Sequence, residues 1–76
     1  MREIVARNLR RLRRSQGLSQ EELADRARIN RNYVGMLERE ENAATVDMLE
    51  KLAEVLNVDP IEFFKRPSRD VIDVKQ

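Results

Sequence analysis

The sequence predicts an all-α domain built from five short helices. Only two glycines and two prolines occur among the 76 residues, which leaves little material for turns. Apolar residues make up 41% of the chain and charged residues 38%, and the apolar ones recur mainly at helical spacing. We therefore expect amphipathic helices packed around one small core.

Helix one is expected from about Arg2 to Gln16, and Gly17 should end it. Val5, Leu9 and Leu12 follow the i, i+4, i+7 spacing of a single buried stripe, while arginines occupy the other faces. This helix should therefore pack on one side and present positive charge on the others.

Helix two is expected from Gln20 to about Ala27, after an N-terminal capping box. The Ser19 hydroxyl can accept a hydrogen bond from the Glu22 amide, and the Glu22 carboxylate can accept one from the Ser19 amide. Leu18 before the cap and Leu23 after it fit the hydrophobic staple of such a start. The buried positions of this helix are expected to be Leu23, Ala24 and Ala27.

Helix three follows after a short turn, with Asn30 as its N-cap and a range of about Arg31 to Arg39. Val34 and Leu37 mark its inner face, and Ile29 ties the turn to the core. Two helices joined in this way form a helix-turn-helix, an arrangement that is also one ordinary way to fold. The outward residues of helix three are Arg31, Asn32, Tyr33 and, one turn on, Met36.

Helix four is expected after the polar segment 40–44, with Thr45 as its N-cap. Its apolar stripe keeps the i, i+3, i+4, i+7 pattern without a break. The stripe consists of Leu49, Leu52, Ala53 and Leu56.

A short helix five should begin with Asp59 as its N-cap and Pro60 at its first helical position, and Pro67 should end it. The residues after Pro67 alternate weakly between apolar and polar, as a frayed tail or as a strand used only in an oligomer. We therefore expect one domain at residues 1–66 and a C-terminal tail at 67–76.

The total net charge of +1 hides an asymmetry along the chain. Residues 1–39 carry ten basic and five acidic side chains, a net charge of +5, whereas residues 40–76 carry five basic and nine acidic ones, a net charge of −4. A chain divided in this way can face an anion with its first half and water or a partner with its second. A solvated surface whose charges happen to segregate is the alternative.

The composition argues against catalysis, metal binding and membrane insertion. Cysteine and histidine are both absent, so the chain lacks a disulfide, a thiolate nucleophile, and the commonest general base and metal ligand. No apolar run is long enough to span a membrane, and residues 1–14 do not look like a signal peptide. We therefore expect a cytoplasmic protein that is not an enzyme and that uses no cofactor, metal, membrane or small-molecule substrate.

Several stretches together resemble the phage repressor and Cro-like (XRE-type) helix-turn-helix family. They are LSQEELA at 18–24, INRNYV at 29–34, LER at 37–39, TVDML at 45–49 and LAEVLNV at 52–58. The resemblance covers about residues 5–64 and implies a five-helix, lambda-repressor-like DNA-binding domain with the helix-turn-helix at helices two and three. The chain is similar in particular to small stand-alone regulators such as controller proteins of restriction-modification systems.

The resemblance implies base reading by Arg31, Asn32 and Met36, which match the family's positions on the recognition helix. Arginine can bond guanine bidentately and asparagine can bond adenine, and each such pair discriminates by about 1–3 kcal/mol. Gln20, at the start of helix two, would bind a phosphate, and Tyr33 would contact a phosphate or sugar. The plainer alternatives are solvated helix surface for Gln20 and Asn32, an intrahelical ion pair for Arg31 and edge-of-core packing for Met36.

The remaining arginines divide between phosphate contacts and a structural role. The candidates for non-specific phosphate contact are Arg10, Arg11, Arg14 and Arg39. In the family the arginine late in helix one pairs with the glutamate late in helix three, which implies an ion pair between Arg13 and Glu38 here. A partly buried pair of this kind fixes orientation more than it stabilises.

Four residues depart from the family's usual pattern. Glu40, followed by Glu41, stands where the family usually has glycine, in a loop that commonly approaches DNA with basic residues. Carboxylates there would repel phosphates, so we assign DNA binding to the first three helices. Arg28 replaces a frequent glycine and is expected to adopt a positive φ. Gly35 costs about 1 kcal/mol inside a helix, and close approach to DNA would explain it, with simple tolerance as the alternative.

The acidic half is expected to carry a dimer interface. Family members usually bind DNA as two-fold dimers on half-sites about 34 Å apart. The apolar residues offered for this interface are Ile61, Phe63, Phe64 and, in the tail, Val71 to Val74. One of the two phenylalanines can instead belong to the core.

We therefore expect a sequence-specific double-stranded DNA-binding transcriptional regulator, either a repressor or an activator that touches RNA polymerase. It would bind a palindromic operator as a homodimer. The second hypothesis is a protein-interaction module, such as an antitoxin or adaptor, with Phe63 and Phe64 as anchors on the same fold. A steep fall of DNA affinity with salt would favour the regulator.

Overall fold

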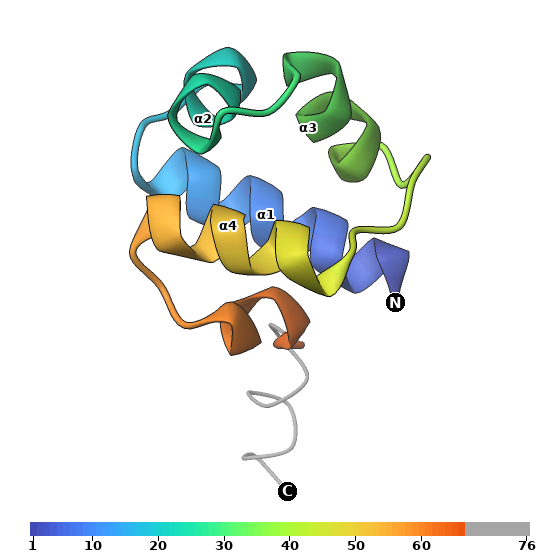
Figure 1. Cartoon of the computed structure of the whole chain (residues 1–76). Coiled ribbons are helices and arrows are strands. Elements are labelled where there is room, and N and C mark those ends of the chain that lie inside the picture. Colours follow the sequence, from blue (N-terminus) through green and yellow to red (C-terminus); the bar gives the residue numbers. More distant parts are fainter. Residues whose placement is uncertain (67–76) are drawn as a thin grey trace, which may run out of the picture.

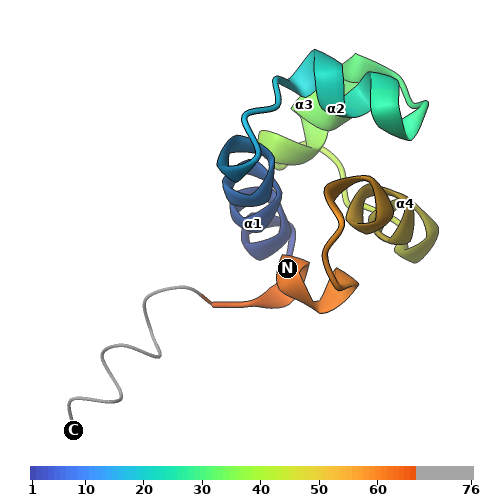
Figure 2. The ribbon, with the colours of Figure 1, turned by 90° about the vertical axis from the view of Figure 1, so that its left-hand side faces the viewer.

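The computed structural model describes residues 1–66, which fold into four α-helices and a terminal 3₁₀ helix. The elements are α1 (Arg2–Ser15), α2 (Gln20–Ala27), α3 (Arg31–Glu38), α4 (Val46–Leu56) and η1 (Pro60–Phe64). α2 and α3 lie on one side of α1 and α4, and η1 lies on the opposite side (Figures 1 and 2). None of the helices in this part of the chain combines the length and apolar character needed to cross a bilayer. The prediction of an all-α fold is confirmed for residues 1–66.

One apolar core joins all five elements. The stripes predicted for the four α-helices lie in this core, as do Leu18 of the predicted staple and Phe63 of η1. η1 contacts both α1 and α4, so Phe63 closes the core at the end opposite α2 and α3. α1, α4 and the ring of Phe63 therefore support α2 and α3 from the core side.

Side-chain caps determine where α2, α3 and α4 begin. The Ser19 hydroxyl accepts from the Glu22 amide at 3.0 Å, and the Glu22 carboxylate accepts from the Ser19 amide at 2.8 Å. This confirms the predicted capping box. Asn30 and Thr45 likewise accept hydrogen bonds from first-turn amides, so the N-termini of α2 and α3 both have fixed directions.

Non-glycine residues with left-handed backbone conformation end or follow three of the helices. Arg28 (φ 60°) caps α2, Asn57 (φ 57°) caps α4, and Glu40 (φ 65°) follows α3. The positive φ predicted for Arg28 is confirmed, and the value at Glu40 explains why glycine suits that position in the family's pattern. α1 and α3 are each one residue shorter than predicted, because Gln16 and Arg39 are C-caps whose amides bond to the preceding turn.

The fifth element is a 3₁₀ helix, so the predicted count of five α-helices is not confirmed, and residues 1–66 contain four. Asp59 caps it and Pro60 occupies its first position, as predicted. A segment of only five residues gains little from α-helical bonds, and tighter i→i+3 bonding is common in such short pieces. The buried Asn8 amide holds the end of this segment by donating to the carbonyls of Phe63 at 2.9 Å and Lys65 at 2.8 Å.

Candidate nucleic-acid interface

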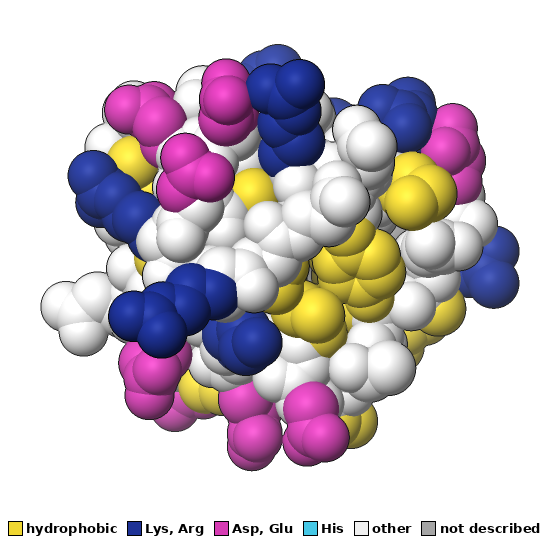
Figure 3. Space-filling model, turned by 45° about the horizontal axis from the view of Figure 1, so that its top comes forward, with side chains coloured by type: hydrophobic (Ala, Val, Ile, Leu, Met, Phe, Trp, Pro, Cys, Tyr) yellow, Lys and Arg dark blue, Asp and Glu magenta, His cyan; other side chains and the backbone are white. Residues whose placement is uncertain are grey.

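The start of α2 and the outer face of α3 enclose one polar hollow of about 240 Å³. Its lining consists of Gln20, Glu21, Arg31, Asn32, Gly35 and Arg39. Arg31 and Gly35 of α3 and its C-cap, Arg39, are spaced four residues apart and so lie along one face of the helix. Asn32 borders that face. Figure 3 views the molecule with the α2–α3 side brought forward, where basic and acidic side chains lie next to one another.

The structure brings together some of the residues predicted to read bases and separates others. Arg31 and Asn32 are exposed at the hollow, next to Gln20. Met36 is half-buried beyond its edge, where the Asn42 amide lies 3.6 Å from the Met36 sulfur. Tyr33 is half-buried against the core and presents only part of its ring to solvent.

Both arginines of the hollow are paired with exposed carboxylates. Arg31 Nη1 donates to Glu21 Oε2 at 3.0 Å, so its partner lies on α2 and the pair is not intrahelical. Arg39 Nε donates to Glu41 Oε2 at 2.9 Å, and this hydrogen bond lowers the pKa of Glu41 below its ordinary value of 4.5. From the sequence, Glu41 was predicted only to repel phosphates and Glu21 was given no role, because neither pairing follows from helical spacing.

Gly35 allows the Arg39 side chain to lie across α3. A Cβ at position 35 would stand 2.9 Å from Arg39 Nη1 and 3.4 Å from Gln20 Oε1. The backbone of Gly35 does not have a positive φ, so close approach is the physical reason for glycine here. The group that approaches Gly35 closely is the Arg39 guanidinium, and the missing side chain leaves it room at the hollow.

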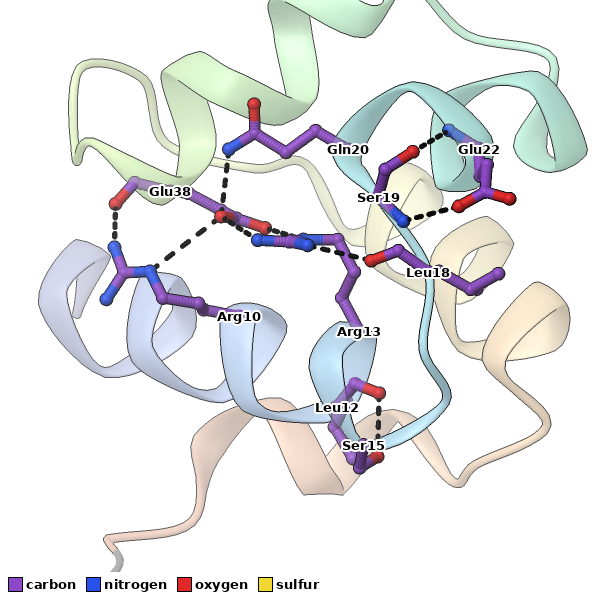
Figure 4. A network of polar contacts seen from close by, with 9 residues as sticks. All are labelled: Arg10, Leu12, Arg13, Ser15, Leu18, Ser19, Gln20, Glu22 and Glu38. Atoms are coloured by element: carbon purple, nitrogen blue, oxygen red, sulfur yellow. Dashed lines mark hydrogen bonds and ion pairs between the residues drawn. The ribbon is translucent and has the colours of Figure 1, made fainter.

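A buried ion pair lies beneath this surface, where α1, α2 and α3 meet (Figure 4). Arg13 donates to both oxygens of the Glu38 carboxylate, at 2.6 Å from Nε and 2.9 Å from Nη2. Its remaining terminal nitrogen donates to the Leu18 carbonyl at 2.8 Å. The pair is bidentate, and both side chains are at most 10% exposed, so it orients α1 against α3.

Glu38 also holds two residues predicted to contact the DNA backbone, one through its carboxylate and one through its main-chain carbonyl. Gln20 Nε2 donates to Glu38 Oε1 at 3.0 Å, and Arg10 Nη2 donates to the Glu38 carbonyl at 2.6 Å. Burial alone would raise the pKa of Glu38, but hydrogen bonds from Arg13 and Gln20 and the charges of Arg13 and Arg10 bring that pKa below 4.5. Glu38 is therefore an ionised hub whose partners extend to the surface.

The arginines of α1 do not all face the same way. Arg14 is exposed and follows Arg10 by four residues, so the two share one side of the helix. Arg11 is turned by about 100° from Arg10, and it bonds Asn8 and lies 3.6 Å from Glu62 of η1. The structure therefore does not bring Arg11 to the α2–α3 side, which corrects its place among the predicted DNA contacts.

The α4–η1 end separates the residues predicted to form a dimer interface. Phe63 has no exposed surface and belongs to the core, so its assignment to the interface is wrong. Ile61 is 61% exposed and Phe64 is 41% exposed. Val71 and the rest of the predicted tail lie outside the described residues.

Hydrogen-bond donors are the chemistry that the hollow offers to a ligand. Arg31, Arg39, Gln20 and Asn32 all carry N–H groups, which suits a partner rich in acceptors such as a nucleic acid. Within residues 1–66, no three acidic side chains gather in a way that could hold a metal ion.

Comparison with known proteins places this geometry among regulators. The family model described as "Helix-turn-helix" matches residues 9–63. An uncharacterized HTH-type transcriptional regulator of Sinorhizobium fredii, y4dJ, is 42% identical over 62 residues, which is 82% of this chain and 80% of the relative. The control protein C.SmaI of Serratia marcescens is 42% identical over 57 residues, which is 75% of this chain and 68% of that protein.

A solved structure is similar over most of the chain. The restriction-modification controller protein C.AhdI from Aeromonas hydrophila aligns with a TM-score of 0.80 and 38% identity. The alignment covers 83% of this chain and 96% of that one. The similarity thus extends over nearly all of a small regulator and is not restricted to the two helices of the motif.

Proposed function

We propose that this chain, which belongs to the helix-turn-helix (XRE-type) family and is a DNA-binding transcriptional regulator, binds a palindromic operator as a homodimer. The observation that supports the proposal is the donor-rich hollow between α2 and α3. We propose binding without catalysis, metal or cofactor, and the cytoplasm remains the predicted location.

We assign base reading to Arg31 and Asn32, with Met36 beside them. The two polar side chains are exposed at the start of α3, where an N-terminal half-turn can enter the major groove. Arg31 has the fork geometry to bond a guanine edge, and Asn32 can bond an adenine edge. Met36, at the margin of the hollow, can make an apolar contact with a thymine methyl group.

Backbone contact is assigned to the side chains that surround this position. Gln20 has a second amide hydrogen beside the one bound to Glu38, and it lies at the positive end of the α2 dipole. Arg10 and Arg14 of α1, Arg39 of α3 and the partly exposed Tyr33 complete the proposed set.

The proposed dimer uses the α4–η1 end. Ile61 and Phe64 are exposed apolar side chains of η1. η1 itself lies on the side of the molecule opposite α2 and α3 (Figure 1). Dimerisation through this end would leave the recognition helix of each protomer uncovered, as binding to two operator half-sites requires. Val71 and the tail 67–76 remain a predicted extension of this interface beyond the domain 1–66.

Selection of bound sites from a random duplex pool tests the proposal. We expect enrichment of one palindrome, a steep fall of affinity with salt, and a dimer in sedimentation. The direction of regulation, including any polymerase contact, follows from transcription assays on the selected site. Failure to enrich any sequence, together with salt-independent behaviour, would overturn the proposal and favour a protein-interaction module that uses Ile61 and Phe64.

A further inference from the structure

The two arginines at the hollow are neutralised by carboxylates on the same face. Arg31 lies 3.0 Å from Glu21, and Arg39 lies 2.9 Å from Glu41. All four side chains are between 53% and 65% exposed. In the free protein, the hollow therefore presents two guanidinium groups whose charge is already compensated.

The fold has little need of these two pairs. Exposed ion pairs contribute little to stability, because water solvates the separated partners nearly as well. The capping box of α2 uses Glu22 and not Glu21. The Glu41 amide bonds the Met36 carbonyl whatever its side chain does. The carboxylates of Glu21 and Glu41 can be removed without removing a structural contact of the core.

The Arg39–Glu41 ion pair joins the hollow, which Arg39 lines, to the loop that follows α3. Because Gly35 has no side chain, the Arg39 guanidinium lies over α3, and the Gln20 side chain approaches the same glycine. Glu41 holds it there from the loop side. Arg39 and Arg31 thus stand at one recognition surface, each with its own internal competitor for a ligand.

DNA without the right sequence gains little by replacing these carboxylates. A phosphate offers each arginine about what the carboxylate already offers, so in a non-specific complex the pairs can persist and the two arginines add no net attraction. A correctly placed guanine edge offers two acceptors to the guanidinium fork, and these two hydrogen bonds offset the loss of the ion pair.

We propose that Glu21 and Glu41 are specificity-determining residues that weaken binding to non-operator DNA more than binding to the operator. The proposal rests on the proposed function and names a further part of the same site. Glu21 keeps Arg31 occupied until a matching base edge takes its place, and Glu41 keeps Arg39 occupied until the docked operator brings a backbone phosphate to it.

The test compares the double variant Glu21→Gln, Glu41→Gln with the unaltered chain by fluorescence anisotropy. The probes are the duplex selected from the random pool and a scrambled duplex of equal length, each over a salt series. Glu50→Gln, Glu54→Gln is the matched control, because it makes the same change in charge at exposed positions on α4. Sedimentation verifies that each variant keeps the oligomeric state of the unaltered chain. Circular dichroism verifies that all variants are folded.

Freeing two arginines should steepen the plot of log K against log salt for the scrambled duplex by up to about 0.9 per arginine. Affinity for that duplex should rise at least about fivefold at low salt, with a smaller rise for the selected duplex. The control should change both duplexes equally and leave the slope as it was.

Equal changes for the two duplexes, or a double variant that behaves as the control, would overturn this inference while leaving the proposed function intact. If the unaltered chain binds no duplex at all, the proposed function fails and the inference fails with it.

Discussion

The Arg13–Glu38 and Arg31–Glu21 pairs join the same two side-chain types under different conditions. The first has a closest approach of 2.6 Å, and its side chains are 10% and 3% exposed. The second has a closest approach of 3.0 Å, and its side chains are 65% and 61% exposed. Their chemistry is alike, so solvent access decides which pair holds the fold together and which is available to a ligand.

The two carboxylates also differ in how many other groups they contact. Glu38 is contacted from α1 and α2, and through Gln20 and Arg10 it connects the core to the proposed DNA-binding surface. Glu21 contacts a single guanidinium that can turn into water when the pair breaks. A change at the buried pair should therefore alter stability first, and a change at the exposed pair should alter binding first.

The largest expected effect is that of Glu38→Ala. Removing the carboxylate leaves the guanidinium of Arg13 buried without its partner, which should lower the free energy of unfolding by about 3–5 kcal/mol. Urea denaturation followed by circular dichroism measures this loss. In the matched control, Glu21→Ala, the exposed pair should contribute less than about 1 kcal/mol. Similar losses in the two variants would remove the distinction between the pairs.

Stability should also depend on pH through the buried pair. The folded-state pKa of Glu38 lies below 4.5, so its stabilising contribution is fully present above that pH and is lost as the pH falls through the lower, folded-state value. The effect should be smaller than that of Glu38→Ala, because a protonated carboxyl can still accept hydrogen bonds. The unfolding free energy of Glu38→Gln should fall less steeply over this range, because the variant lacks the titration of Glu38. It should still fall, because other carboxyls titrate in both proteins. Parallel curves would show that Glu38 does not carry this dependence.

Arg31→Ala tests the exposed pair from the side of the ligand. Loss of a bidentate base contact should weaken operator binding by about 1–3 kcal/mol and relax selectivity at one base pair of each half-site. The melting temperature should stay close to that of the unaltered chain, because Arg31 is exposed. Titration of single-base operator variants measures the selectivity. A uniform loss across all these duplexes would assign Arg31 to the phosphate backbone instead.

The sequence was sufficient to predict the elements and the core, because both depend on local spacing. The apolar stripes placed Leu9, Leu23 and Leu52 inside, and the Ser19 capping box located the start of α2. The docking of η1 on α1 could not be predicted, since its C-terminal end is held by the side chain of Asn8, which is more than fifty residues away.

The candidate site was only partly predictable for the same reason. Helical periodicity showed that Arg31 and Asn32 face outward, and the Arg13–Glu38 pair came from the family resemblance alone. The bond from Gln20 to Glu38 and the pairing of Arg31 with Glu21 depend on how separate helices pack and on which rotamers they allow. No spacing rule within one helix contains that information.

Gly35→Ala should produce the smallest effect and separate stability from binding most clearly. Alanine is better than glycine inside a helix by about 1 kcal/mol, so the fold should be unchanged or slightly more stable. The new Cβ would stand 2.9 Å from Arg39 Nη1, and the flexible end of that side chain is what must move. Displacing it disturbs the Arg39–Glu41 pair and should weaken operator binding modestly.

Thermal unfolding and anisotropy on the same preparation measure both effects of Gly35→Ala. Arg39→Ala is the matched comparison, because it removes the displaced group and leaves the glycine in place. If Gly35→Ala binds the operator as tightly as the unaltered chain, the position of Arg39 over α3 is not part of recognition. A loss of binding with unchanged or raised stability would show that this glycine serves the surface and not the core.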